Sequence, residues 1–261
     1  MIPIRLKRCK YILGLSQKLR YSVATILSYV EPYVGFYGSL INKISRDLII
    51  AYQDSVFLVP DYWSIRYFDP LDEAFVWRYM NIDRGVFIDI GAHVGKYTVI
   101  MAKKLKNAGT ALAFEPHPVN FRYLIINLSL NKVSNVLPFN MACYSSDGYL
   151  DLYIARESGL HSLVRPRSGN KIRVKTCTLD SIIEKLHIDN VKLIKIDVEG
   201  AEIEVIKGAI KTIVKHRPTI IVEVWFSNIA EFVKLMSKLN YRIKVLSTGP
   251  DITYIVAFPR C

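Results

Sequence analysis

The sequence predicts an α/β fold with a mostly parallel sheet, and two observations point to it. Residues 86–90, which are apolar except for Asp89, form a run that is typical of a buried strand, and Gly91 and Gly95 follow before a helical pattern begins at about Lys96. Downstream, strand-like and helix-like segments alternate with one interruption, which predicts parallel strands joined by right-handed crossovers. The 261 residues, 51% of them hydrophobic, suffice for one large domain or for one domain with an appendage.

The strand, glycine turn and helix at residues 86–98 are the typical opening of a nucleotide-binding α/β domain. Gly91 permits a sharp turn, and Gly95 lets a ligand or the strand approach the helix closely. The G-x-x-x-G spacing differs from the G-x-G-x-x-G of dinucleotide-binding proteins, and no phosphate-binding loop with its lysine is present. A turn of this kind also occurs for packing alone, so a ligand site needs a second indication.

Residues 1–50 form a basic extension with a helical pattern, in which Arg and Lys lie among Leu, Ile and Tyr. The rest of the chain, residues 51–261, is expected to form the main domain. Its first segments are a strand at 51–60 and a short helix at 72–79.

The next elements alternate regularly. Helices are predicted at 96–106 and 119–130, and strands at 110–114 and 135–139. Pro138 lies in the last of these strands. Because proline cannot donate a hydrogen bond to a neighbouring strand, this strand should lie at an edge of the sheet.

A small antiparallel insertion interrupts the alternation. Segments 149–154 and 171–176 alternate apolar and polar residues, and a polar loop at 155–170 joins them. Loops of this length are often functional. The remaining predicted elements are a helix at 178–186, strands at 191–196 and 219–225, helices at 201–214 and 229–236, and final strands at 241–246 and 252–258. The short turn between the last two strands makes them antiparallel.

The chain carries a net charge of +12, with an isoelectric point near 9.5. The basic residues are spread along the chain, which favours a solvated surface; attraction to an anionic partner is the alternative. No nucleic-acid partner is expected, because there is no arginine-rich block and no RNA-reading aromatic motif. The four cysteines lack the spacing of a metal site or a disulfide framework. A cytoplasmic protein is expected, since no secretory signal or uninterrupted membrane-spanning stretch is found.

A carboxylate after the second core strand supplies the second indication of a ligand site. Glu115 follows residues 110–114, 26 positions after Asp89, and precedes Pro116. An acidic side chain there accepts hydrogen bonds from the two hydroxyl groups of a ribose. Together with the glycine turn, Glu115 indicates an adenosyl ligand. A surface glutamate at the start of a helix is the simpler alternative and is compatible with this role.

More acidic residues follow the fourth core strand. They are Asp197, Glu199 and Glu202, and they follow the carboxyl end of the strand, which is where open α/β sheets bind ligands. Glu223 lies inside the fifth strand, where a charge is costly unless it is paired or solvated. His93 lies in the glycine turn, where a histidine that only forms hydrogen bonds is the commoner case.

These segments resemble the FkbM-type S-adenosylmethionine-dependent methyltransferases. The most specific match is the run Lys-Ile-Asp-Val-Glu-Gly at 195–200, and the resemblance covers about residues 70–225. Further matches lie at 87–98, at 113–118 with Asn120 and Phe121, at 127–131, at 178–180, at 201–202 with Gly208, and at 217–223. Residues 1–50 lie outside the resemblance. His93 stands where the family usually has asparagine.

The resemblance implies a Rossmann-like class I methyltransferase fold, with seven strands in the order 3-2-1-4-5-7-6 and the last strand antiparallel. It also implies S-adenosyl-L-methionine as the cofactor, and O-methylation of a hydroxyl on a sugar, glycolipid or natural product. In such a site Asp89, Gly91 and Gly95 frame the methionine part of the cofactor. Glu115 would hold the ribose, and Asn140 and Met141 would border the adenine. The expected cofactor-binding residues are Asp89, Gly91, Ala92, His93, Gly95, Glu115, Pro116, Asn140, Met141 and Asp197.

Methyl transfer needs alignment of the acceptor, and a base helps to remove its proton. The expected base is the pair Asp197 and Glu199, with Glu202 and with His161 of the long loop as further candidates. No metal is expected, because Glu223 lies inside its strand and should point away from the cleft. A nicotinamide-dependent oxidoreductase, disfavoured by the glycine spacing, and a non-catalytic nucleoside-binding protein are the alternatives.

The expected partner is a small-molecule or glycan acceptor, and the oligomeric state is open. Residues 1–50 are free to cap the cleft, to contact another subunit or to lie on a membrane, since the downstream helices already suffice to cover both sheet faces. Their mixture of Arg and Lys with apolar residues is typical of an interfacial helix, so peripheral membrane contact through this segment is possible. Packing on the domain, with the charges toward water, is the alternative.

Overall fold

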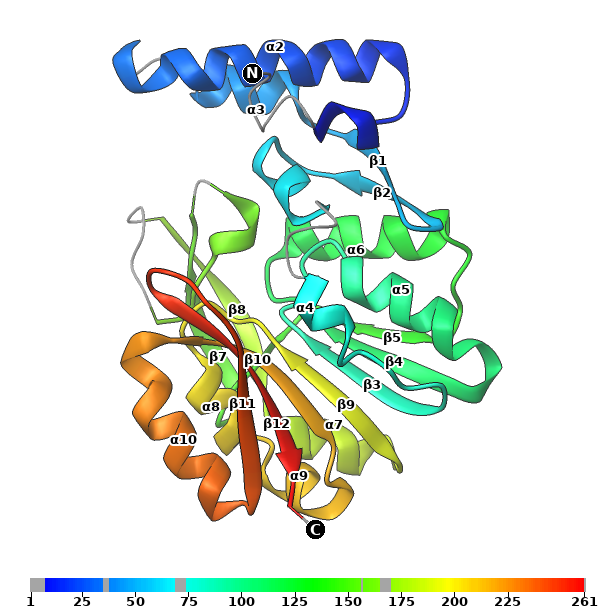
Figure 1. Cartoon of the computed structure of the whole chain (residues 1–261), viewed down its shortest axis with the longest axis vertical. Helices are drawn as coiled ribbons and strands as arrows, with labels where there is room; N and C mark the ends of the chain where they lie inside the picture. Colours follow the sequence, from blue (N-terminus) through cyan, green and yellow to red (C-terminus); the bar gives the residue numbers. More distant parts are fainter. Residues whose placement is uncertain (1–7, 35–37, 69–73, 156, 165–169, 261) are drawn as a thin grey trace.

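A seven-stranded sheet forms the centre of the protein (Figure 1). In the computed structural model, residues 8–34, 38–68, 74–155, 157–164 and 170–260 are described. The strand order is β5-β4-β3-β9-β10-β12-β11, and β12 runs antiparallel to both of its neighbours. Counted along the sequence this order is 3-2-1-4-5-7-6, which confirms the fold class that the resemblance implies.

The elements of this layer lie close to their predicted positions. The strands are β3 (Gly85–Ile90), β4 (Gly109–Phe114), β5 (Val136–Phe139), β9 (Val191–Ile196), β10 (Thr219–Trp225), β11 (Tyr241–Thr248) and β12 (Ile252–Pro259). The α-helices around them are α4 (Ala74–Trp77), α5 (Lys96–Leu105), α6 (Pro118–Leu130), α7 (Leu179–Lys185), α8 (Glu202–Lys207), α9 (Ile210–His216) and α10 (Ile229–Lys238). Short 3-10 helices η3 (Lys106–Ala108) and η5 (Phe226–Asn228) join some of them.

Helices cover both faces of the sheet. Ile88 and Ile194 point to one face, where they share a buried cluster with Phe232 of α10. Phe87 and Leu193, one position away on the same strands, point to the other face and pack against α4 and α5. Successive side chains of a strand alternate between the faces, so apolar strands of this kind are buried on both sides.

Strand β5 lies at the edge of the sheet, and among the described residues it pairs with β4 alone. Pro138 lies within it. The missing N–H of proline needs no partner on the open side of an edge strand. The predicted edge position is therefore confirmed.

The prediction of one continuous helix at 201–214 is wrong in one respect, because the structure has two helices there, α8 and α9. Gly208 lies at the break, and a Cβ on it would overlap the backbone carbonyl oxygen of Tyr144. The chain approaches the loop after β6 (Ala142–Cys143) too closely there for any larger residue. The helical periodicity continues across this break, so periodicity alone does not reveal it.

The strand predicted at 51–60 is also wrong, because the structure has a hairpin there. Strands β1 (Leu48–Tyr52) and β2 (Ser55–Val59) pair antiparallel, and Gln53 in the turn has a φ of 53°. Both strands are apolar and β-branched, so the two together resemble one longer run. The hairpin begins inside the segment that was expected to be a helical extension.

The N-terminal helices lie over this hairpin (Figure 1). They are the 3-10 helix η1 (Arg8–Tyr11), α2 (Leu15–Val34) and α3 (Gly38–Ile44). Tyr21 and Ala24 of α2 and Ile41 of α3 form one buried cluster with Phe57 of the hairpin and Leu124 of α6. The N-terminal helices and the large sheet therefore share a continuous apolar core.

Two asparagines of α6 fasten the hairpin to the main domain. Asn127 Oδ1 accepts the Leu58 N–H at 2.7 Å, and Asn131 Oδ1 accepts the Val56 N–H at 3.0 Å. Each side-chain amide donates back to the carbonyl group of the same residue. Side chains thus pair the outer edge of β2, where a strand edge would otherwise be open.

The insertion forms a second, three-stranded sheet. Strand β8 (Lys171–Cys177) pairs antiparallel with β7 (Gly148–Tyr153), as predicted, and also pairs with β6. The 3-10 helices η2 (Trp63–Phe68) and η4 (Ser158–Leu160) touch each other, because Ser64 Oγ and Ser158 Oγ lie 2.9 Å apart. No helix in the described parts of the chain is both long and apolar enough to cross a bilayer.

Candidate functional site

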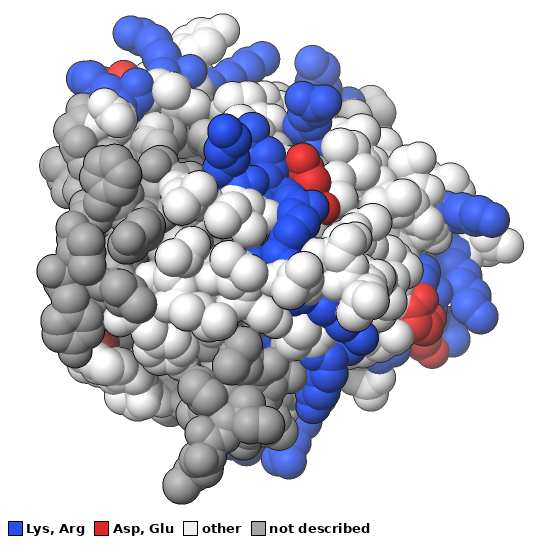
Figure 2. All heavy atoms as spheres, turned by 90° about the horizontal axis from the view of Figure 1, so that it is seen from above, with Lys and Arg blue, Asp and Glu red and all other residues white. Residues whose placement is uncertain are grey.

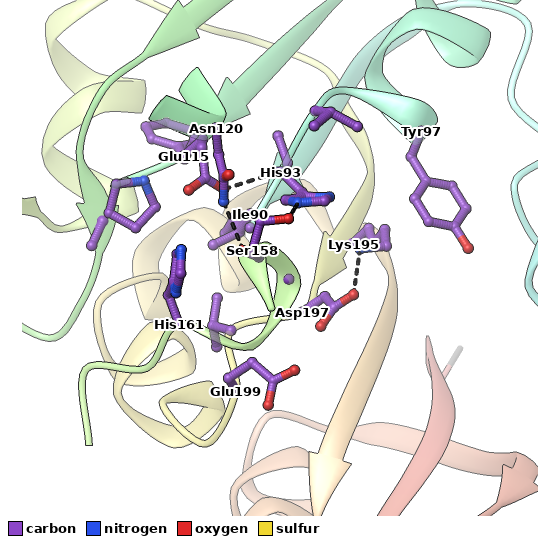
Figure 3. Close-up of a pocket in the computed structure, with 18 of the residues that line it drawn as sticks. Ile90, His93, Tyr97, Glu115, Asn120, Ser158, His161, Lys195, Asp197 and Glu199 are labelled. Atoms are coloured by element: carbon purple, nitrogen blue, oxygen red, sulfur yellow. Dashed lines mark hydrogen bonds and ion pairs between the residues drawn. The ribbon is translucent and has the colours of Figure 1, made fainter. Parts of the chain in front are cut away.

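A cavity with ≈ 910 Å³ of open space lies beyond the carboxyl ends of β3, β4 and β9 (Figure 3). Open α/β sheets bind their ligands at this position. The wall of the cavity comes from the glycine turn after β3, the segment after β4, the end of β9, and parts of η2 and η4.

The glycine turn after β3 places backbone directly in this wall. Gly91 has a φ of +81°, and a Cβ on it would overlap the carbonyl oxygen of Asp197. The Asp197 N–H donates to the Ile90 carbonyl at 3.0 Å, which joins the ends of β3 and β9. A Cβ on Gly95 would lie 2.5 Å from Leu124 Cδ1 of α6. Close packing against backbone therefore requires glycine at 91, and the φ of +89° favours glycine at 95.

Glu115 presents a fixed carboxylate to the cavity. Its two oxygens accept the backbone N–H groups of His93 and His117, each at 2.9 Å. The side chain is 5% exposed, and burial raises its pKa to about 7. A carboxylate oxygen has more than one acceptor position, so Glu115 can still accept two hydroxyl groups of a ligand. This geometry suits the expected contact with a ribose.

Two buried polar atoms in the cavity wall, Asn120 Oδ1 and His161 Nε2, have no hydrogen-bond partner among the described residues. Burial lowers the pKa of His161 to about 3, so its ring is neutral. The ring Nδ1 accepts the Ala155 N–H at 3.0 Å, which leaves the ring proton on Nε2. Buried polar groups normally have partners. The Asn120 acceptor and the His161 donor therefore match a polar ligand such as an adenosyl group. Because Nε2 of His161 carries a proton, His161 is placed to donate a hydrogen bond in the cavity and not to act as the expected base.

Residues distant in sequence form a hydrogen-bonded chain over the cavity (Figure 3). Ser158 Oγ of η4 lies 2.8 Å from His93 Nε2 and 2.9 Å from Ser64 Oγ of η2. Ser64 Oγ donates to Asp61 Oδ1 at 2.8 Å, and the Ser158 carbonyl accepts Asn120 Nδ2 at 2.8 Å. Burial lowers the pKa of His93 to about 4, so its ring is neutral and acts as a hydrogen-bonding group.

Sequence reasoning did not identify Asp61, Ser64 or Ser158. They belong to no motif, and 94 positions separate the two serines that touch. The length of the loop at 155–170 was the one indication that this region contributes to the site.

Acidic side chains gather at the end of β9. One carboxylate oxygen from each of Asp197, Glu199 and Glu223 lies within 4.8 Å of the other two. The expectation that Glu223 points away from the cleft is therefore wrong. Ile221 pairs with Lys195, so Glu223, two residues further, reaches the level of Asp197 on the same face of the sheet. Burial, with the charge of Asp197, raises the pKa of Glu223 to about 9.

Lys195 is a buried cation beside this cluster (Figure 3), and sequence reasoning gave it no role. Its Nζ lies 3.2 Å from Asp197 Oδ2 and 3.9 Å from Asp89 Oδ1. It also lies 4.6 Å from the ring centre of Tyr97. Lys195 therefore holds the side chain of Asp197 in a defined position at the cavity.

Glu202, a further candidate for the base, is used elsewhere. Its carboxylate accepts the Gly200 N–H at 2.8 Å and Asn228 Nδ2 at 2.6 Å. It therefore joins the start of α8 to the segment that follows β10. Of the carboxylates after β9, Asp197 and Glu199 are the ones that line the cavity.

Most of the expected site residues come together. Those in the cavity wall are Gly91, Ala92, His93, Glu115, Pro116, His161, Asp197 and Glu199. Among the described residues, Asp89, Gly95, Asn140 and Met141 are not part of that wall.

The reason differs for each residue outside the wall. Asp89 is fully buried behind the turn, where it accepts the hydroxyl of Thr98 at 2.6 Å. Asn140 Nδ2 donates to the carbonyl oxygens of Glu115 and Pro116, so it supports the segment after β4. Met141 packs against the apolar core. The next two residues, 142 and 143, line the cavity in their place.

Comparison with known proteins identifies the family. The sequence profile of the methyltransferase FkbM domain matches residues 89–243, which is more than half of the chain. The chain belongs to the FkbM methyltransferase family. It is 30% identical to methyltransferase sdnD from Sordaria araneosa over 179 residues, 56% of this chain and 68% of that protein. It is 25% identical to hexuronic acid methyltransferase AglP from Haloferax volcanii over 174 residues, 66% of this chain and 69% of that protein.

A solved structure shows the same fold. The methyltransferase FkbM from Methylobacillus flagellatus KT matches with a TM-score of 0.50 and 19% identity. The match covers 67% of the present chain and 44% of the solved chain. The present chain therefore spans less than half of the length of that solved relative.

The resemblance drawn from the sequence is thus confirmed, and the chain is a methyltransferase with S-adenosylmethionine as its cofactor. The alternative of a nicotinamide-dependent oxidoreductase is wrong. The cavity fits this cofactor in the chemistry of its wall: a fixed carboxylate for the ribose, and an acceptor and a donor that lack protein partners.

Proposed function

We propose that this FkbM methyltransferase transfers a methyl group to a hydroxyl oxygen of a sugar, a glycolipid or a natural product. The observation that carries the proposal is the pair of carboxylates in the cavity wall, Asp197 and Glu199. A hydroxyl acceptor must lose its proton during the reaction, and a carboxylate within reach can accept it. The similarity to a hexuronic acid methyltransferase supports a sugar acceptor.

One half of the cavity would hold the cofactor. Glu115 accepts hydrogen bonds from the ribose hydroxyls, and Asn120 Oδ1 and His161 Nε2 pair with further polar atoms of the adenosyl group. Bound S-adenosylmethionine supplies a methyl group that its sulfonium charge already activates. The hydrogen bond between the neutral His93 ring and Ser158 holds η4 over this half of the cavity, which limits the access of water.

The other half would hold the acceptor. Lys195, at 3.2 Å, orients Asp197 toward the cavity, and Glu199 lies beside it. The acceptor hydroxyl donates its hydrogen bond to this pair and passes its proton to it as the oxygen takes up the methyl group. Orientation of the acceptor oxygen by these two carboxylates, of which Lys195 holds Asp197 in place, supplies the alignment on which methyl transfer depends.

In the test, the full-length chain is incubated with S-adenosylmethionine that carries an isotopically labelled methyl group. The acceptors are methyl glycosides of a neutral hexose, of a hexuronic acid and of an amino sugar. We expect the label in a methyl ether, which survives mild alkali. Asp197→Asn and Glu199→Gln should each lower kcat, by about 100-fold for loss of a general base. The affinity of Glu199→Gln for S-adenosylhomocysteine should stay unchanged.

Glu184→Gln, an exposed change on α7, is the matched control and should leave kcat unchanged. A label that mild alkali releases would show a methyl ester on the carboxyl group of the hexuronic acid. A label on the amino sugar nitrogen would show N-methylation. Either result, without any ether, contradicts methylation of a hydroxyl.

A further inference from the structure

Helix α2 turns an apolar stripe toward solvent. Leu15 is 86% exposed, Leu19 is 65% exposed and Ile26 is 58% exposed, and Val23 and Tyr29 are exposed on the same side. Steps of three and four residues place these five side chains on one side of a helix. We call this stripe, residues 15, 19, 23, 26 and 29, the outer face of α2.

The inward side of α2 is more polar than its outer face. Gln17 Oε1 accepts the Ile49 N–H at 2.6 Å, and Thr25 Oγ1 accepts the hydroxyl of Tyr62 at 3.2 Å. Ser28 is buried as well and donates to the Thr25 carbonyl. A surface helix normally buries its apolar stripe and exposes its polar side. The inward side of α2 mixes these polar groups with the buried Tyr21 and Ala24, and the outer face is apolar as well, so α2 exposes an apolar stripe that would be more stable under an apolar cover.

The positive charge of this part of the chain indicates which kind of partner covers the outer face of α2. Residues 1–50 contain eight Lys and Arg residues and two acidic residues. Lys10 and Lys43 are exposed next to the helices, and Leu13 and Leu40 extend the apolar surface. Figure 2, which views the molecule from this side, shows more Lys and Arg than Asp and Glu among uncharged side chains. An exposed apolar stripe in a segment rich in Lys and Arg is typical of a helix that lies in the surface of an anionic bilayer.

We propose that the outer face of α2 docks on an anionic lipid bilayer, parallel to its surface. A second copy of the chain is a poorer cover, because two molecules with a net charge of +12 each repel one another. The 20 residues of α2 are about 30 Å long, which gives an extended contact, and they lie on the bilayer without crossing it. This inference does not depend on the chemistry of the acceptor.

The test is co-sedimentation of the full-length chain with vesicles. One vesicle type contains phosphatidylglycerol and phosphatidylcholine, and the other contains phosphatidylcholine alone. We expect binding to the anionic vesicles at low salt, and weaker binding at about 0.1 M salt, where charges are screened beyond about 10 Å. The triple variant Leu15→Ser, Leu19→Gln and Ile26→Ser should bind the anionic vesicles at least about tenfold more weakly.

A control variant removes three other apolar side chains that are 50–55% exposed: Leu130→Gln, Val214→Ser and Val245→Thr. It should bind vesicles as the unchanged chain does. A third variant, Lys10→Ala with Lys43→Ala, keeps the stripe and should lose much of the salt-sensitive part of the binding. Thermal melting and binding of S-adenosylhomocysteine establish that each variant is folded.

Three outcomes overturn the proposal. The first is an unchanged chain that ignores anionic vesicles at low salt. The second is a control variant that loses binding as much as the α2 variant does. The third is a dimer in solution that the α2 variant converts to monomer, without any lipid binding by the unchanged chain, which would show a second copy as the cover. If the α2 variant does not fold, the lysine variant and the salt dependence decide the question.

Discussion

Glu115 is a buried carboxylate at the centre of the cofactor half of the cavity. The backbone amides of His93 and His117 fix its position, so it loses little freedom when a ligand binds. Its burial is costly for the charged form, which is why the pKa rises to about 7. Both properties lead to predictions at the scale of single residues.

Replacement of Glu115 by glutamine should weaken the binding of S-adenosylhomocysteine. The change keeps the shape of the side chain but replaces a charged acceptor by a neutral amide. A hydrogen bond to a charged group contributes about 1.5–3 kcal/mol, so the dissociation constant should rise about 10- to 150-fold. Isothermal titration calorimetry measures it, with Glu184→Gln as the exposed control.

The pH dependence of the affinity tests the same residue independently. The ionised carboxylate accepts the ribose hydroxyls, and protonation removes acceptor capacity. Because the pKa is about 7, affinity should fall as the pH is lowered from about 8 to about 6. The Glu115→Gln variant should show no such dependence. A profile that is the same in both proteins would contradict the role of this carboxylate.

Chelation of divalent cations should leave turnover unchanged. Asp197, Glu199 and Glu223 lie close enough to share a cation, but Lys195 Nζ already lies 3.2 Å from Asp197 Oδ2, and burial disfavours the charged form of Glu223. Tyr254 hydrogen-bonds to this carboxyl group. Hard cations prefer several ionised oxygens. We expect equal rates with and without EDTA, and nearly full turnover in Glu223→Gln. Loss of activity with EDTA that magnesium restores would show the opposite.

Sequence identified the parts of the site that are local in the chain. Gly91 and Glu115 each follow a strand directly, so the strand pattern predicts where their backbone lies. Ser158 reaches His93 across 65 positions, and Glu223 reaches Asp197 from the neighbouring strand. Such contacts depend on loop paths and on sheet register, which no periodicity encodes. The register of β10 against β9 also explains why the expected direction of Glu223 was wrong.

At the scale of elements, Gly208 fixes the join between α8 and α9. Gly208→Ala should destabilise the protein, since its Cβ would overlap the rigid backbone of Tyr144. Overpacking of this kind typically costs about 1–3 kcal/mol. Gly249→Ala is the matched control, because its Cβ would meet Ile252 at an ordinary 3.5 Å. Urea unfolding measures both, and equal midpoints would show that the loop after β6 can move aside.

Element types could be predicted from sequence more reliably than element breaks. Strands that are mostly apolar, such as β3 and β9, were located correctly because most of their side chains are buried, on both faces of the sheet. Pro138 placed β5 at the edge through its missing N–H. The break at Gly208 and the hairpin turn at Gln53 were missed, because each depends on a backbone conformation or contact within an otherwise regular pattern.

At the scale of the whole molecule, the N-terminal helices have two different sides. Their inner side belongs to the core that includes Phe57 and Leu124, and their outer side is the apolar stripe of α2. Sequence alone presented packing on the domain and contact with a membrane as alternatives. The structure makes packing certain for the inner side, and it leaves the outer side available for docking. The two roles are therefore compatible, and substitutions on the outer face separate them.

Deletion of residues 1–47 should destabilise the whole chain. It would remove Ile12, Tyr21 and Ile41, which are each buried to 99% or more, and would uncover Ile50 and Phe57 beneath them. Loss of one large buried apolar side chain costs about 2–5 kcal/mol, whereas the total stability of a domain is about 5–15 kcal/mol. We expect aggregation or a much lower melting temperature in thermal scans, whereas the triple variant of the outer face should melt like the unchanged chain. A truncated chain that melts at the original temperature and binds S-adenosylhomocysteine would show that the large sheet is stable without its N-terminal cover.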